Sequence, residues 1–213
     1  MHLLLSIEQP GSDINTAATG MPAGADPATH APDGVAGWRW EGGVGHVQLA
    51  GLFRSLGYDA PNNADQTVLG WGASASGAFN LFQADKFLWQ LSYGHGIARY
   101  VNDLGSSGMD AALDASGNLE AIPVFAAVVG YTHEWSKHFR STASFGYVTA
   151  DPTATLGALA IERTTYSSLN LVWHPTTSFR MGLEYLYGTK DTQGGADGDG
   201  HRLDLVFRYD LVR

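Results

Sequence analysis

The 213-residue sequence contains no cysteine. Without thiols the chain cannot form disulfides, zinc–thiolate sites or a cysteine nucleophile. Charge is also scarce, because Asp, Glu, Lys and Arg make up 15% of the residues, against about a quarter in typical soluble domains. Basic residues number 12 and acidic residues 21, so the formal net charge is −9. Nucleic-acid binding needs a basic surface, and we therefore exclude nucleic acid as a partner.

Long hydrophobic runs are missing as well. The longest apolar stretch, residues 121–131, is interrupted by Pro123 and Gly130, and it is shorter than the roughly 18 residues of a membrane-spanning helix. The first residues lack the basic start of a signal peptide and soon reach Glu8 and Pro10. We therefore expect neither a helical membrane protein nor a signal peptide in this chain.

Apolar and polar residues do alternate along the sequence with a period of two. In the last segment Leu203, Leu205 and Phe207 alternate with Asp204 and Arg208, which indicates a strand with one apolar and one polar face. The same pattern recurs along the chain. It predicts about ten strands, near residues 2–8, 35–42, 44–55, 66–80, 86–102, 119–134, 138–150, 158–173, 178–189 and 201–212.

The connections between these strands alternate between short turns and long loops. Short turns lie near 41–43, 81–85, 135–137 and 174–177, and long loops near 9–34, 56–65, 103–118, 149–157 and 189–200. This alternation is typical of a transmembrane barrel. We predict an all-β fold in one domain, 1–213: an antiparallel, meandering transmembrane β-barrel of about ten strands. A long irregular loop at 9–34 precedes four β-hairpins and a closing strand within 35–213. The loop is rich in proline, and we expect it to be partly disordered.

A soluble barrel would also alternate, with its apolar face inward, so the placement of aromatic residues is the deciding observation. Apolar-phase aromatics flank every short turn; the alternative is that they are core aromatics that cap a soluble barrel. They predict an aromatic girdle at one membrane interface, formed by Trp40, Phe79, Trp89, Trp135, Phe139, Trp173 and Phe179.

Several segments resemble the C-terminal part of the DcaP-like porins. They are WHPTTSFRMGLEYLYG at 173–188, GHVQLAG at 45–51, YGHGIARY at 93–100 and YTHEW at 131–135. The similarity runs in order from about Ser6 to Arg213. It implies a bacterial outer-membrane diffusion channel, a homotrimer surrounded by outer-membrane lipid, that passes small hydrophilic, anionic solutes such as dicarboxylates. Because such porins resemble closed barrels of about 16 strands, the resemblance implies a partial barrel of a larger porin.

The polar phase of the predicted strands is rich in arginine, while lysine is rare and does not occur there in mid-strand. Fixed positive charge in a lumen favours anions. Counting outward from the turns pairs Arg140 with Glu134, Arg180 with Arg208, and Arg39 with His46. These charges either contact solutes or only fill and stiffen a small barrel. The residues predicted to line the pore are Arg39, His46, Arg54, Glu134, Arg140, Arg180, Glu184, Arg202, Asp204 and Arg208.

The eight histidines show no spacing that predicts a metal site or a catalytic group. His133 and His138, for example, lie on either side of a turn. We expect no enzyme activity, no catalytic residue, no metal and no cofactor. The predicted function is passive diffusion of small anionic solutes through an outer-membrane porin or porin fragment. The alternatives are a membrane barrel filled by its side chains, which anchors without conducting, and a soluble binding barrel.

Overall fold

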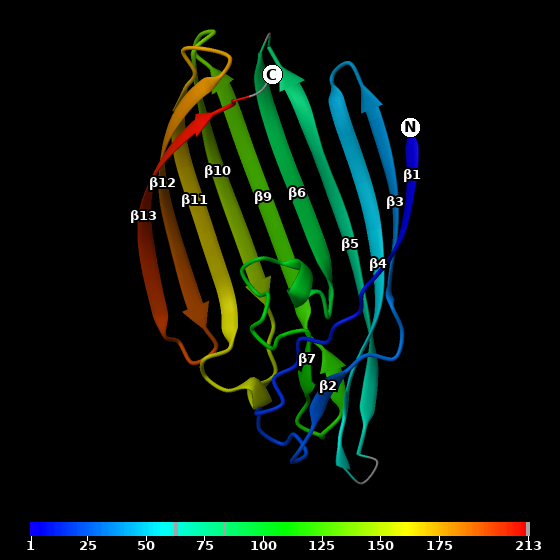
Figure 1. Ribbon diagram of the computed structural model, residues 1–213. Coiled ribbons are helices and arrows are strands. Elements are labelled where there is room, and N and C mark those ends of the chain that lie inside the picture. The colour runs from blue at the N-terminus through cyan, green and yellow to red at the C-terminus, as the bar shows by residue number, and fades with distance from the viewer. Residues whose placement is uncertain (62–63, 83, 212–213) are drawn as a thin grey trace.

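The computed structural model describes residues 1–61, 64–82 and 84–211. Ten long strands follow one another in a single antiparallel sheet (Figure 1). They occur where the alternation predicted them, although position 212 of the last predicted strand lies outside the described residues. The strands are β1 (His2–Glu8), β3 (Asp33–Gly42), β4 (Gly45–Asp59), β5 (Gln66–Leu81), β6 (Asp85–His95), β9 (Pro123–Glu134), β10 (Phe139–Ala150), β11 (Ile161–Trp173), β12 (Phe179–Thr192) and β13 (Asp197–Tyr209).

In the part of the chain that the structure describes, three short strands and two short 3-10 helices lie outside this series. β2 (Asp26–Ala28) pairs with β4, and β7 (Ala111–Leu113) pairs with β8 (Leu119–Ala121). The helices are η2 (Ala98–Tyr100) and η3 (Ala154–Leu156). In the described part of the chain, no helix is both long enough and apolar enough to cross a membrane.

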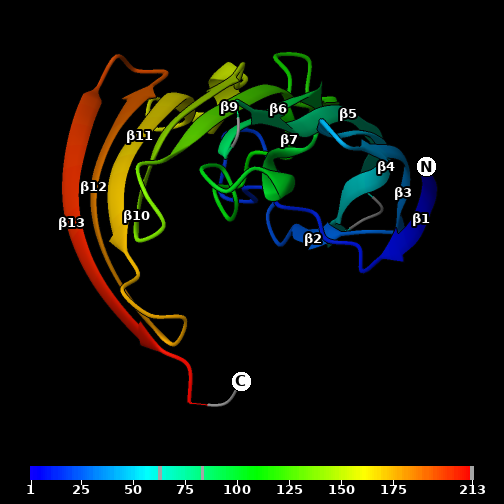
Figure 2. The same cartoon turned by 90° about the horizontal axis from the view of Figure 1, so that it is seen from above.

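The sheet is an open arc rather than a closed barrel (Figure 2). β1 pairs only with β3, and β13 pairs only with β12, so within the described residues the two end strands do not meet. The predicted antiparallel meander is confirmed, but its ten strands do not close into a barrel, and an open arc is what the alternative prediction, a partial barrel of a larger porin, implies. The diameter of a barrel grows with its number of strands, and ten strands with this shallow curvature cover only part of a circle.

Two predicted strands are shorter than expected. The segment predicted at 86–102 leaves the sheet after His95, because Gly96 adopts a positive φ of 73° that redirects the chain. The segment predicted at 119–134 is divided at Ile122, whose N–H bonds to the carbonyl oxygen of Asp110. Both breaks release one long connection, residues 96–122, from the plane of the sheet.

The two faces of the arc differ in polarity. Side chains in the apolar phase, such as Val129 and Leu169, point to the convex side and are exposed. The buried core lies on the concave side, where the long connections fold inward (Figure 2). There Ile14 forms backbone bridges to Met109 and Ala111. The segment 9–34 is therefore packed and ordered, contrary to the expected partial disorder, because it shares a core with residues 96–122.

Candidate functional site on the concave face

Arg54 lies on the concave side of β4, where its side chain is 0% exposed. Its guanidinium donates to the carbonyl oxygens of Gly11 and Gly96, which belong to the two inward loops. Its Nε lies 3.0 Å from Oδ2 of Asp33, and Nη1 lies 2.9 Å from Oδ1 of Asp110. This burial differs from the prediction that Arg54 lines an open lumen. The side chain points to the predicted side, but the loops cover it.

Asp110 joins the two inward loops to each other as well as to the sheet. Its carboxylate accepts the backbone N–H groups of Asp13 and Arg99, each at 3.0 Å. The carboxylate of Asp13 in turn accepts the N–H of Gly108 at 3.1 Å. Burial raises the pKa of Asp110, and the nearby Arg54 guanidinium opposes that rise by favouring the charged form. One buried cluster of charges thus holds both loops against the sheet.

Tyr100 of η2 makes a further contact with the edge of the sheet. Its hydroxyl lies 2.8 Å from Oδ2 of Asp33 and 3.1 Å from Oε2 of Glu8. The Arg54 guanidinium carbon lies 5.1 Å from the centre of the tyrosine ring, within cation–π distance. Burial raises the pKa of Tyr100, and the two carboxylates raise it further. The hydroxyl therefore keeps its proton and acts as a hydrogen-bond donor.

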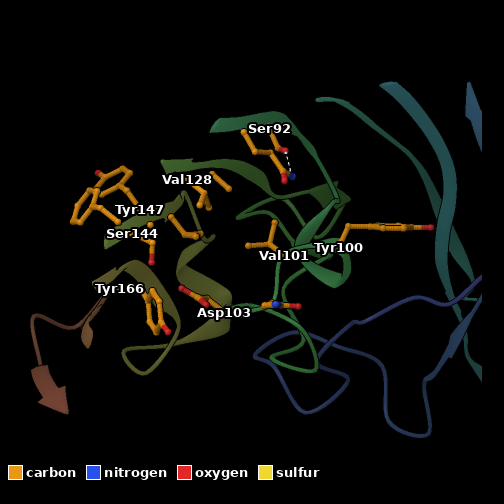
Figure 3. A pocket seen from close by; sticks show the side chains of 14 residues that line it. Ser92, Tyr100, Val101, Asp103, Val128, Ser144, Tyr147 and Tyr166 are labelled. Atoms are coloured by element: carbon orange, nitrogen blue, oxygen red, sulfur yellow. Dashed lines mark hydrogen bonds between the residues drawn. The ribbon is translucent and has the colours of Figure 1, made fainter. Parts of the chain in front are cut away.

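Residues 98–103, which we call the strap, cross the concave face from one side of the arc to the other. At one end Tyr100 contacts β1 and β3, and at the other Asp103 accepts a hydrogen bond of 2.5 Å from the hydroxyl of Thr164 on β11. A cavity of about 550 Å³ lies between the strap and β6, β9, β10 and β11. Figure 3 shows Val101 and Asp103 of the strap opposite Ser144 in this cavity. A second cavity, of about 250 Å³, lies between the strap and the strands β3 to β6.

The concave face of β10, β12 and β13 carries a separate group of arginines. Arg140, Arg180 and Arg208 line one hollow of about 210 Å³ together with Glu184 and Asp204. Arg140 and Arg180 also line an adjoining hollow of about 220 Å³ next to the β11–β12 turn. The side chains of Arg180 and Arg208 are 42% and 62% exposed, so their charges are open to a solute.

The strand register brings like charges together in this hollow. Arg180 is directly opposite Arg208, and Glu184 is directly opposite Asp204. Asp210 partly neutralises the arginine pair, with its oxygens 3.5 Å from Nη2 of Arg180 and 2.9 Å from Nε of Arg208. Two positive charges therefore share one carboxylate, which leaves a surplus of positive charge at this point.

Two further predicted pairs have different outcomes. Arg140 lies opposite Glu134, but within the described residues it makes no ion pair. Arg39 does not lie opposite His46: it faces Gln48, while His46 faces Glu41. The reason is that the turn is centred one residue later than predicted, with Gly42 paired to Gly45, and this shifts the register by two.

All ten residues predicted to line the pore lie in the phase that faces the concave side. Besides the arginines already described, Arg202 bonds to Asp204, with its Nη2 at 2.7 Å. The sequence interpretation missed Asp33, Asp110 and Tyr100. In the sequence, these three residues are recognisable only as two acidic residues and a tyrosine near the ends of predicted strands. That position does not show that Arg54 is their common partner.

Six of the seven aromatic residues predicted to form a girdle lie near the short-turn ends of their strands, whereas Trp89 lies in the middle of β6, opposite Val129. Trp173 lies 6.3 Å from Phe139 and 6.4 Å from Phe179, measured between ring centres. A second level of aromatics, which the sequence interpretation missed, lies nearer the long loops and includes Trp71, Tyr93, Phe125 and Tyr147. Phe139 and Tyr147 are eight positions apart on β10, or about 27 Å along a strand, close to the apolar band of about 25 Å in outer-membrane barrels.

A long antiparallel meander with an apolar convex face and a polar concave face is typical of outer-membrane β-barrel proteins, the class that includes the porins. A model of the family described as "DcaP outer membrane protein" matches residues 39–211. The chain belongs to this family, and its place is the outer membrane.

Solved structures support the fold. The outer membrane channel DcaP of Acinetobacter baumannii superposes with a TM-score of 0.82 at 24% sequence identity, over 97% of this chain and 57% of that one. The chain thus spans 57% of the length of that channel. The NanC porin has a TM-score of 0.44 at 10% identity, over 88% of this chain and 97% of that one, and this weaker likeness carries no argument. No curated protein sequence matches the chain.

Proposed function

We propose that the chain forms the wall of an outer-membrane pore through which small hydrophilic anions diffuse passively. The observation that carries the proposal is the hollow lined by Arg140, Arg180 and Arg208 on the concave face. Guanidinium groups bind carboxylates through charge-assisted hydrogen bonds, often two at a time. Arginines around one hollow therefore suit a solute with two carboxylates.

A pore also requires that the free edges of the sheet be paired. In lipid, an unpaired backbone N–H or C=O costs several kcal/mol, so spanning sheets are closed. We therefore propose that further strands pair with β1 and β13 in the membrane. We also propose that the closed pore assembles into a homotrimer, with outer-membrane lipid against the convex face.

The test is the ion selectivity of the refolded protein in planar bilayers under a salt gradient. The double variant Arg180→Ser/Arg208→Ser removes the paired arginines and should reduce the anion preference, which shifts the reversal potential toward that of a non-selective pore. Arg163→Ser is the control, because Arg163 lies in the opposite phase, 2.7 Å from Asp191. Equal reversal potentials for the wild type and the double variant would contradict the proposal.

A second candidate is a membrane anchor: the sheet, once closed by further strands, would not conduct. It is favoured by the inward loops, which cover part of the concave face and bury residues such as Leu104 and Met109. Single-channel recording separates the two functions. Stable ohmic steps support the pore, whereas silence from a protein that still shows heat-modifiable barrel migration supports the anchor.

A further inference from the structure

The strap lies over the concave face between two cavities. Tyr100 and Val101 line both the larger and the smaller cavity, so these two residues separate the spaces on either side. On the sheet below, Gln90 and Ser92 line both cavities as well. The two cavities therefore adjoin each other where the strap lies over β6.

We propose that the strap is the constriction of the pathway and that Arg54 is its positioning residue. The constriction role of the strap rests on the proposed function, whereas the positioning role of Arg54 does not. Arg54 contacts the chain before the strap through Gly96, the ring of Tyr100 within it, and the chain after it through Asp110. These contacts fix the strap from both of its ends.

Apolar packing also holds the strap, but in a different way. Ile97, Ala98 and Val101 are buried in a cluster with Ile122 and Val124. Such packing is non-directional. It therefore keeps the strap near the sheet, but it does not fix the distance between the strap and the concave face. The guanidinium has a rigid planar set of donors that a lysine cannot reproduce. Only the arginine can satisfy two carboxylates and two carbonyl oxygens at once.

Limited trypsin digestion of the refolded chain tests the positioning. Arg99 lies in the strap, and it is the sole Lys or Arg between positions 96 and 122. In the wild type its N–H is bonded to Asp110, so we expect slow cleavage after Arg99. Arg54→Met and Arg54→Lys should both be cleaved there at least about tenfold faster, because local opening controls proteolysis. The control Arg39→Met removes an arginine of the same face that does not contact the strap, and it should behave like the wild type.

An engineered disulfide, which we call the lock because it can be closed by oxidation and opened by reduction, keeps the test decisive if Arg54 variants are poorly folded. A Cβ built on Gly72 lies 3.9 Å from Cβ of Ile97, within the range of a disulfide. The chain has no other cysteine, so Gly72→Cys/Ile97→Cys should link the residue just before the strap to β5 and hold that end of the strap in place. In the Arg54→Met background, oxidation should restore slow cleavage at Arg99 and reduction should abolish it. Fast cleavage in the oxidised form, or wild-type cleavage of Arg54→Met alone, would overturn the positioning role.

Single-channel recording of the same proteins tests the constriction. Arg54→Met should raise the mean conductance by about twofold or more, since a displaced strap widens the passage, and the oxidised lock should return it to the wild-type value. Faster cleavage with an unchanged conductance would overturn the constriction role. Silence of every variant, including the wild type, would instead contradict the proposed function, while the cleavage result would still decide the role of Arg54.

Discussion

Arg54 and Arg208 are the same residue type in the same strand phase, yet they lie in different environments. Arg54 belongs to the half of the sheet from β1 to β6, where the inward loops bury it against Asp33 and Asp110. Arg208 belongs to the half from β10 to β13, where its side chain is exposed beside Asp210. Strand phase therefore determines the face on which an arginine lies. The loops determine whether it is buried in a cluster of charges or exposed on the concave face.

The energetic consequence follows from burial. Removing one partner of a buried ion pair leaves the other charge without compensation, whereas an exposed pair is weakened by water and salt. We therefore expect substitutions in the covered half to change stability. In the open half, the same substitutions should change selectivity.

The largest expected effect is that of Arg54→Met on unfolding in urea. The free energy of unfolding of this variant should be about 3–5 kcal/mol lower than that of the wild type, because Asp33 and Asp110 stay buried without their cation. Arg202→Met, which removes an exposed partner of Asp204, should lose less than about 1 kcal/mol. Equal losses of unfolding free energy in the two variants would contradict the proposed difference between the covered and the open half of the sheet.

A smaller effect is expected for Tyr100→Phe. The change removes the hydroxyl that bonds to Asp33 and Glu8 and should cost about 1–2 kcal/mol by the same measurement. Tyr166→Phe is the matched control in the open half, where the tyrosine also lines the large cavity, and it should change stability by less than about 0.5 kcal/mol. If the control costs as much as Tyr100→Phe, the hydroxyl contacts do not hold the strap.

Local sequence patterns predicted the strands well, because alternation is a property of neighbouring residues. Counting from a turn also predicted cross-strand neighbours where the turn was placed correctly, as for Arg140 and Glu134. It failed for Arg39 and His46, where an error of one residue in the centre of the turn shifted the register by two.

Features that depend on distant parts of the chain were not predictable in this way. The cluster around Arg54 joins Asp33, Asp110 and Gly11, which lie far apart in the sequence. Sheet closure is also a property of all strands together, since it depends on their number and curvature. A pattern with a period of two contains neither kind of information.

We propose that the convex face meets lipid while the concave face is the polar side of a pore. Val128 and Val129 test it directly, because they are adjacent on β9, lie on opposite faces and are 48% and 42% exposed. Val129→Arg should destabilise the protein folded into lipid vesicles by about 2–4 kcal/mol, as expected for a lipid-facing arginine near mid-membrane, and Val128→Arg by about 1 kcal/mol or less. Equal losses for the two variants, or a larger loss for Val128→Arg, would contradict the account.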